Sequence, residues 1–419
     1  MDLLKNIFFN ESLRKKILFT LGVIVVYRIG AHIPIAGIDI DALKQLFQGG
    51  VLGFVNLFSG GGLSRFSIFA LGILPYINAS IIMQLLTILW PKLKQLTEEG
   101  ESGRKQISQY TRYLAIVLAL FQSVMMAVSF RTFVNPDVNF FFFLFYAVIG
   151  LVAGSALIMW FAELITEFGI GNGASLVIFV GIVAQMPMYI NSTLILVKGG
   201  TSIIRVAILL AVLVLMVFAI VFIYEGQRKI LVQYAKRMVG RKVYGGQNTY
   251  IPLRLIQGGV LPIIFASAIL QFPLMFSQFV NVPRVQQFFS LYYRYDGFFY
   301  NGFFCFLIFF FTYFYTAVTF NPQELADNIK KYGGFIVGVR PGKSTVDYLE
   351  KIISKLTLIG AVCLAFIALV PTVAARLTQV TSFMGLGGTA LLIIVGVAID
   401  LVKQIDTYLI TQKYDKLYS

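Results

Sequence analysis

The chain has 419 residues, of which 58% are hydrophobic and only 13% are charged. Soluble proteins carry about 25% charged residues, so this composition excludes a soluble globular protein and indicates one that buries most of its surface in lipid. The net charge of +15 would suit nucleic-acid binding. However, the basic residues cluster in short segments between apolar stretches, which is typical of the cytoplasmic loops of a membrane protein.

Ten apolar stretches long enough to cross a bilayer follow one another along the chain. They predict an all-α polytopic membrane protein with ten transmembrane helices, at about 17–33, 68–90, 112–130, 140–162, 174–190, 203–224, 258–280, 298–320, 352–374 and 386–402. The first stretch lacks a small-residue cleavage pattern, so it is interpreted as a resident span and not as a signal peptide. Most of the 34 lysines and arginines fall in alternate connecting segments. The positive-inside rule therefore predicts that both termini are cytoplasmic.

The stretch LFSGGGLSRFSIFALGILPY, residues 57–76, is unusual at the entrance of a membrane span. Three glycines and Arg65 precede the apolar run, and glycine lowers the cost of local rearrangement. Pro75 is predicted to kink the second span, because a proline inside a helix removes one hydrogen bond and crowds a carbonyl. Arg28, inside the first span, is interpreted as an anchor whose guanidinium reaches outward. Taken alone, these residues favour a static re-entrant turn.

The domain organisation is predicted from the spans and from the segments between them. Five spans fall in an N-terminal half, residues 1–190, and five in a C-terminal half, residues 203–419, with the glycine-containing segment 191–202 as an outer hinge connector. An odd number of spans per half inverts the second half in the membrane, so pseudo-symmetric halves are expected. Two basic cytoplasmic loops, about 225–257 and 321–351, are long and contain turn signals. They are expected to form folded protrusions.

The residue patterns of an enzyme or of an ion-coupled transporter are missing from the sequence. GVRPGKST resembles the end of a phosphate-binding loop, but Val337 stands where that motif requires glycine. The single histidine, His32, excludes a histidine-rich metal site or a serine–histidine dyad. We therefore expect no catalytic residue, metal or cofactor. Coupled transport is disfavoured because Glu163, Glu167 and Asp400 lie near cytoplasmic ends of predicted spans and not at mid-membrane.

Several longer segments, in order along the chain, resemble the SecY family, the central subunits of the bacterial protein translocase. They are YRIGAHIPIAGID, LFSGGGLSRFSIFALGILPYINASIIMQLL, EEGESGRKQISQYTRY, GIGNGASLVIFVGIVA, VQYAKRMVGRKVYGGQNTYIPL, LADNIKKYGGFIVGVRPGKSTVDYL and GGTALLIIVGVAIDLVKQIDTYL. The resemblance implies a channel that moves unfolded secretory polypeptides across the bacterial plasma membrane and releases membrane-protein helices laterally into it. It also implies two five-span halves around an hourglass pore, with a lateral gate that opens to lipid.

The resemblance further implies roles for individual residues. A plug in the outer funnel, within about 56–67, would comprise Asn56, Leu57, Phe58, Ser59, Gly60, Gly61, Gly62, Leu63, Ser64 and Arg65. A pore ring would comprise Ile73, Ile77, Ile178, Ile264 and Ile393, while Ala174 stands where the family often has a larger aliphatic residue. Such a ring suits an unfolded chain because aliphatic groups bind nothing specifically. When the ring is empty, it excludes water and hydrated ions.

The lateral gate and the partners are also implied by the resemblance. Gate residues would be Gln84, Thr87, Gln122 and Gln271, in spans two, three and seven. Partner docking is implied for Lys236, Arg237, Arg241 and Lys242 on the first long loop and for Arg340 on the second. The implied partners are the small membrane subunits SecE and SecG, the SecA ATPase motor, the ribosome through its RNA, secretory preproteins with their signal sequences, and the lipid bilayer. A small-solute transporter and a membrane scaffold are the alternatives.

Overall fold

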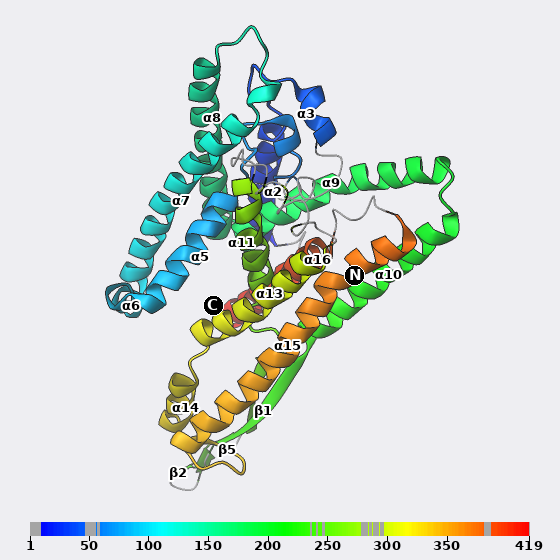
Figure 1. Ribbon diagram of the computed structural model, residues 1–419. Coiled ribbons are helices and arrows are strands. Elements are labelled where there is room, and N and C mark those ends of the chain that lie inside the picture. The colour runs from blue at the N-terminus through cyan, green and yellow to red at the C-terminus, as the bar shows by residue number, and fades with distance from the viewer. Residues whose placement is uncertain are drawn as a thin grey trace.

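A computed structural model describes residues 10–46, 56, 59–234, 237–239, 242–244, 248–277, 284, 287, 293, 297–380 and 387–418. In these ranges, ten helices follow the predicted spans in order (Figure 1). They are α2 (Glu11–Gly30), α5 (Leu74–Leu89), α7 (Glu101–Ser129), α8 (Phe140–Phe168), α9 (Gly173–Lys198), α10 (Ile203–Glu225), α11 (Leu261–Ser277), α13 (Phe298–Thr319), α15 (Lys343–Thr378) and α16 (Gly388–Tyr418).

Length and apolar composition separate these helices into two groups. Within the described residues, seven helices are long and apolar enough to cross a membrane, and an eighth counts if α5 and α6 (Pro91–Glu98), bent by 105°, form one span. The two others are α2, which begins with charged residues, and α11, of which Leu261–Leu270 counts as a shorter apolar helix. The predicted helical membrane class is confirmed, and all ten helices occur in the predicted order.

The N-terminal and C-terminal helices meet along two seams. On one side α5 packs against α11, and on the other α9 packs against α16. One apolar core spans these seams and takes residues from both halves, including Ile77, Ile178, Ile264 and Ile393. Helix α9 continues to Lys198, so only residues 199–202 of the segment 191–202 lie outside helices.

Pro75 begins a helix instead of bending one. α5 starts at Leu74, which places Pro75 in the first turn, where its missing N–H is not needed and its fixed φ suits a helix. The predicted kink is therefore wrong, and residues 67–73 form turns before the helix. Two backbone hydrogen bonds join this stretch to the residues after α2: Ile35 N–H donates to Phe66 O (2.9 Å) and Ile68 N–H donates to Ile33 O (3.1 Å).

The two long loops, which the charge distribution predicts to be cytoplasmic, fold together into one unit, named the cytoplasmic unit after that prediction; it lies at the lower end of the molecule in Figure 1. Strands β1 (Gln227–Tyr234) and β4 (Asn248–Arg254) of the first loop pair antiparallel, and β5 (Gly334–Ile336) of the second loop adds to the free edge of β1. A hairpin of β2 (Arg237–Val239) and β3 (Lys242–Tyr244) extends the first loop, and α14 (Pro322–Lys331) precedes β5.

This cytoplasmic unit has its own apolar core, to which both loops and the start of α15 contribute. Its buried members are Ile230, Val232, Leu253, Ala326, Ile329, Ile336, Val346, Leu349, Ile352 and Ile353. The unit agrees with the expectation of folded protrusions, but the strands and their pairing were not foreseen. Elsewhere in the described chain, short elements connect the spans: α3 (Ile40–Leu46), η1 (Leu63–Arg65) and η2 (Arg131–Phe133).

Candidate functional site

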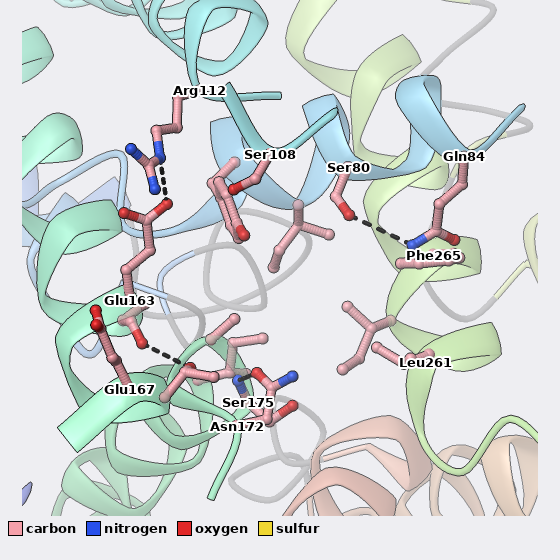
Figure 2. A pocket seen from close by; sticks show the side chains of 17 residues that line it. Ser80, Gln84, Ser108, Arg112, Glu163, Glu167, Asn172, Ser175, Leu261 and Phe265 are labelled. Atoms are coloured by element: carbon pink, nitrogen blue, oxygen red, sulfur yellow. Dashed lines mark hydrogen bonds and ion pairs between the residues drawn. The ribbon is translucent and has the colours of Figure 1, made fainter. Parts of the chain in front are cut away.

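A cavity of ≈ 370 Å³ lies between the two halves, lined by α5, α7, α8, α9 and α11 (Figure 2). Figure 2 shows Arg112, Glu163 and Glu167 on one side of it and Leu261 and Phe265 on the other. The charged residues belong to the helix ends that the charge distribution assigns to the cytoplasm. The cavity therefore has one polar and one apolar wall, at the end of the bundle that is predicted to be cytoplasmic.

An ion pair fixes the polar wall. Arg112 Nε of α7 lies 2.7 Å from Glu163 Oε1 of α8, which ties these two helices together at the cavity (Figure 2). Next to it, the Thr166 hydroxyl accepts a hydrogen bond from Gly173 N–H (2.9 Å), which holds the start of α9 against the end of α8. A Cβ on Gly173 would overlap Ala162 O, so this close approach requires glycine. The polar wall is thus a rigid junction of three helices.

The five predicted ring isoleucines are all buried in the main core. Their exposed fractions are 1% for Ile73, 5% for Ile77, 1% for Ile178, 2% for Ile264 and 0% for Ile393. Ile77, Ile178 and Ile264 also line the cavity, whereas Ile73 and Ile393 do not. Ala174 lines the cavity as well, so its small side chain leaves space on the cytoplasmic side of Ile178.

The predicted plug segment is described at Asn56 and from Ser59 to Arg65; Leu57 and Phe58 lie outside the described residues. It forms turns and the short 3₁₀ helix η1, and its internal hydrogen bonds keep it compact. Asn56 Oδ1 accepts from Ser64 N–H (2.9 Å), Asn56 O accepts from Gly61 N–H (3.0 Å), and the Ser59 hydroxyl accepts from Leu63 N–H (3.0 Å). The segment is therefore a folded turn with little helical order.

The plug segment is seated between α2 and α9. A Cβ on Gly60 would lie 3.1 Å from Gly181 Cα, and a Cβ on Gly61 would overlap Gln185 Nε2. Arg28 Nη1 donates a hydrogen bond to Gly60 O (2.9 Å). Arg28 therefore anchors the plug segment, a partner that its interpretation as an outward-reaching anchor did not name. The sequence signal that could have indicated this is an arginine in an apolar span with no acidic residue one helical turn away.

The cavity, a buried isoleucine and the plug segment follow one another along α9. Ala174, Ser175 and Ile178 line the cavity, and Gly181 and Gln185 lie beside Gly60 and Gly61 of the plug segment. Three residues of helix rise by about 4.5 Å, so Ile178 lies at the level between the two features. On α5, Ile73 precedes the first turn, whereas Ser80 and Gln84 line the cavity. On α9, the buried Ile178 therefore lies between the other cavity residues and the plug segment, and the grouping of the five isoleucines into one ring stays a prediction.

The predicted gate residues belong to α5, α7 and α11. Gln84 lines the cavity, and its amide donates to the Ser80 hydroxyl on its own helix (3.4 Å). Thr87 donates to Gln84 O (2.7 Å), and Gln122 is buried on α7. Gln271 belongs to α11, but its side chain lies outside the described part of the structure.

The predicted docking residues lie on the cytoplasmic unit. Arg340 is exposed in the turn between β5 and α15, and its carbonyl accepts from the Thr345 hydroxyl (2.9 Å). Gly338 and Gly342, with φ of 81° and 105°, shape this turn. Arg237 and Lys242 lie on the hairpin of β2 and β3, whereas the backbones of Lys236 and Arg241 and all four side chains lie outside the described residues.

Solved structures with a similar fold are protein-conducting channels. One described as a protein conducting channel has a TM-score of 0.66 and 18% identity, and covers 94% of this chain and 91% of its own. A second, whose description concerns the plug domain of SecY and the closed state of the translocation channel, has a TM-score of 0.64 and 19% identity, with the same coverage. At these identities the likeness establishes the fold alone.

Sequence comparison establishes the family. The family model described as SecY matches residues 67–402. The protein translocase subunit SecY of Thermotoga maritima is 41% identical and aligns over 98% of this chain and 96% of its own length. The SecY subunits of Synechococcus elongatus and Escherichia coli are 46% and 44% identical and align over 97% and 96% of this chain, and over 94% and 93% of their own lengths. The fold, the plug-like turn and these matches lead to one conclusion: the chain belongs to the SecY family.

Proposed function

We propose that this chain is the central channel of a protein translocase, which moves unfolded secretory polypeptides across the bacterial plasma membrane and releases membrane-protein helices laterally into it. The observation that carries this proposal is the order of features along α9: cavity, buried Ile178, plug segment. Its relatives carry the name protein translocase subunit, which supports the same function.

The channel is a transporter and not a catalyst, and its residues act by excluding or admitting other molecules. In the idle state the isoleucines Ile73, Ile77, Ile178, Ile264 and Ile393 form the narrowest point and exclude water. A hydrated ion does not cross, because loss of its hydration costs tens of kcal/mol in an apolar medium. A translocating polypeptide then fills the constriction, and aliphatic side chains let every residue type pass.

Lateral release occurs where α5 and α7 face α11 and α13. On this side α5 of the N-terminal half packs against α11 of the C-terminal half, and this is the seam that opens in the proposal. Hydrogen bonds between membrane helices average under about 1 kcal/mol, so Gln84, Thr87, Gln122 and Gln271 hold the gate weakly enough for release. The opposite seam stays closed, and residues 191–202 join halves 1–190 and 203–419 on the outer side.

The cytoplasmic unit is the docking surface for the partner that drives translocation. Both termini are cytoplasmic, which puts Arg340 and the hairpin with Lys236, Arg237, Arg241 and Lys242 on the side where polypeptides enter. Arginine binds carboxylates of a motor such as SecA, or phosphates of ribosomal RNA, in bidentate fashion. A similar fold occurs in a Sec61 channel described in a canine ribosome–channel complex, which supports the ribosome as a partner. SecE and SecG complete the membrane complex.

Reconstitution tests the proposal. The complex is placed in proteoliposomes with a radiolabelled secretory preprotein, and protease-protected product is measured with and without SecA and ATP. We expect protected product only when motor and ATP are both present. Uptake of a small solute along an ion gradient, with no protected preprotein, would instead support a secondary transporter. Inactivity in both assays would support a scaffold.

A further inference from the structure

A charged donor reaches the plug segment from the first membrane helix. Arg28 is half-buried near the end of α2, and its Nη1 donates to Gly60 O at 2.9 Å. Arginine keeps its charge under all physiological conditions, and a hydrogen bond from a charged donor is about twice as strong as one between neutral groups. The contact joins residues that are 32 positions apart in the sequence, so it fixes the segment to the bundle and not to its own neighbours.

The shape of the turn presents its carbonyl to Arg28. Gly60 and Gly61 have φ of 62° and 87°, a left-handed conformation that side chains with a Cβ rarely adopt. A Cβ on Gly60 would lie 2.9 Å from Arg28 Nη1 and 3.1 Å from Gly181 Cα. The glycine therefore lets the turn touch α9 on one side while its carbonyl accepts from α2 on the other.

The remaining hydrogen bonds of the segment are internal. In the part of the chain that the structure describes, the other hydrogen bonds of residues 56–65 are made within residues 56–67. The turn can therefore leave its seat as a folded piece. Two hydrogen bonds then break: the one from Arg28 on the first membrane helix, and the one from Ile35 N–H, after that helix, to Phe66 O.

Tyr27, next to Arg28 in the sequence, lies beside the same turn and allows packing to be compared with hydrogen bonding. Its hydroxyl would lie 3.3 Å from a Cβ on Gly60, but this hydroxyl has no hydrogen-bond partner among the described residues. Its ring stacks on Phe69, with centroids 5.9 Å apart. Tyr27 thus packs beside the same turn without bonding to it, whereas Arg28 bonds to it.

From these contacts we infer that Arg28 is a positioning residue that latches the plug segment in its seat, through the hydrogen bond to the Gly60 carbonyl. The inference rests on the proposed plug function and adds the group that holds the plug when no polypeptide is present. Displacement of the plug then requires that the bond from Arg28 be replaced, for example by a carbonyl of the incoming polypeptide or by water.

Thiol labelling tests the latch directly. Ser64→Cys places a reporter in the turn, and its reaction with a membrane-impermeant maleimide, added from the outer side of the reconstituted idle complex, reports how often the segment leaves its seat. The parent chain, which holds Cys305 and Cys363 within spans, gives the background. Arg28→Met removes the donor and keeps an apolar side chain. We expect the labelling rate to rise roughly 10-fold or more, as for loss of one hydrogen bond to a charged group.

Two further variants separate the bond from the packing. Arg28→Lys keeps a charged donor and should restore most of the slow labelling, whereas Tyr27→Phe should label at the parental rate.

Gly60→Ala leaves Arg28 in place but pushes a Cβ against its guanidinium, so it should raise labelling as Arg28→Met does. It also serves as the test if Arg28→Met fails to insert.

Two results would overturn the latch: parental labelling in an inserted Arg28→Met variant, or equally raised labelling in Arg28→Met and Arg28→Lys. The plug function is decided separately by the resting conductance of a variant that lacks residues 57–65. A leak in that variant together with parental labelling in Arg28→Met would leave the plug standing and remove the latch.

Discussion

Replacing Ile393 by asparagine should open the idle channel. Ile393 is 0% exposed and belongs to the same core as Ile77 and Ile264. An amide buried without partners costs about 1–3 kcal/mol, and this cost disappears when the constriction fills with water. Taking about 2 kcal/mol as the central value, the ratio of open to closed channels should rise roughly 30-fold.

Single-channel recording of the purified complex in planar bilayers, without polypeptide or motor, measures this ratio as resting open probability. The matched control is Leu392→Asn. Leu392 is adjacent on α16 and is also 0% exposed, but it points about 100° away around the helix. An Ile393→Asn channel that stays as closed as the parent would refute the ring assignment. Equal opening in Leu392→Asn would show general destabilisation instead of a wetted constriction.

Three other perturbations address the plug and the cytoplasmic unit. Deletion of residues 57–65 should leave insertion unchanged but raise the resting ion conductance. The rise should be graded, because neighbouring segments can enter the vacated space. Unchanged conductance would argue against a plug. Arg340→Glu should lower motor-driven translocation roughly ten-fold while insertion and the idle seal are preserved. The matched charge reversal is Lys351→Glu, at a residue that is exposed as well and lies on α15. Normal transport by the Arg340 variant would remove its docking role. Leu349→Ala should destabilise the cytoplasmic unit by about 2–5 kcal/mol, seen as faster proteolysis within 225–257, and unchanged proteolysis would contradict a shared core.

The sequence predicted the spans well because an apolar stretch of bilayer length has few other uses. It predicted the start of the second span poorly. Pro75 ends or bends a helix when it is internal and begins one when it is in the first turn, and the local sequence does not distinguish these cases. The strands escaped prediction because β5 is three residues long and exists only through pairing with β1, about a hundred positions earlier in the chain.

The candidate site was only partly predictable for a related reason. Every isoleucine in an apolar span has the pattern of ordinary core packing, so the ring assignment came from the family resemblance and not from periodicity. The partner of Arg28 was not predicted because it is a backbone carbonyl, which no side-chain pattern reveals. The glycines alone favoured a static turn and the plug came from the family resemblance, whereas the positive φ values at Gly60 and Gly61 give the physical reason for these glycines.

Because the two cytoplasmic loops fold together, a force on them is transmitted to helices of the C-terminal half. Helix α15 runs for 36 residues from the sheet into the membrane, about 54 Å of continuous helix. Because β5 is paired with β1, which follows α10 directly, a load applied at the Arg340 turn reaches α10 and α15 together. A force applied at the Arg340 turn therefore acts as a torque on the C-terminal half. Because α15 is long, a small change in its angle moves its far end by several ångströms.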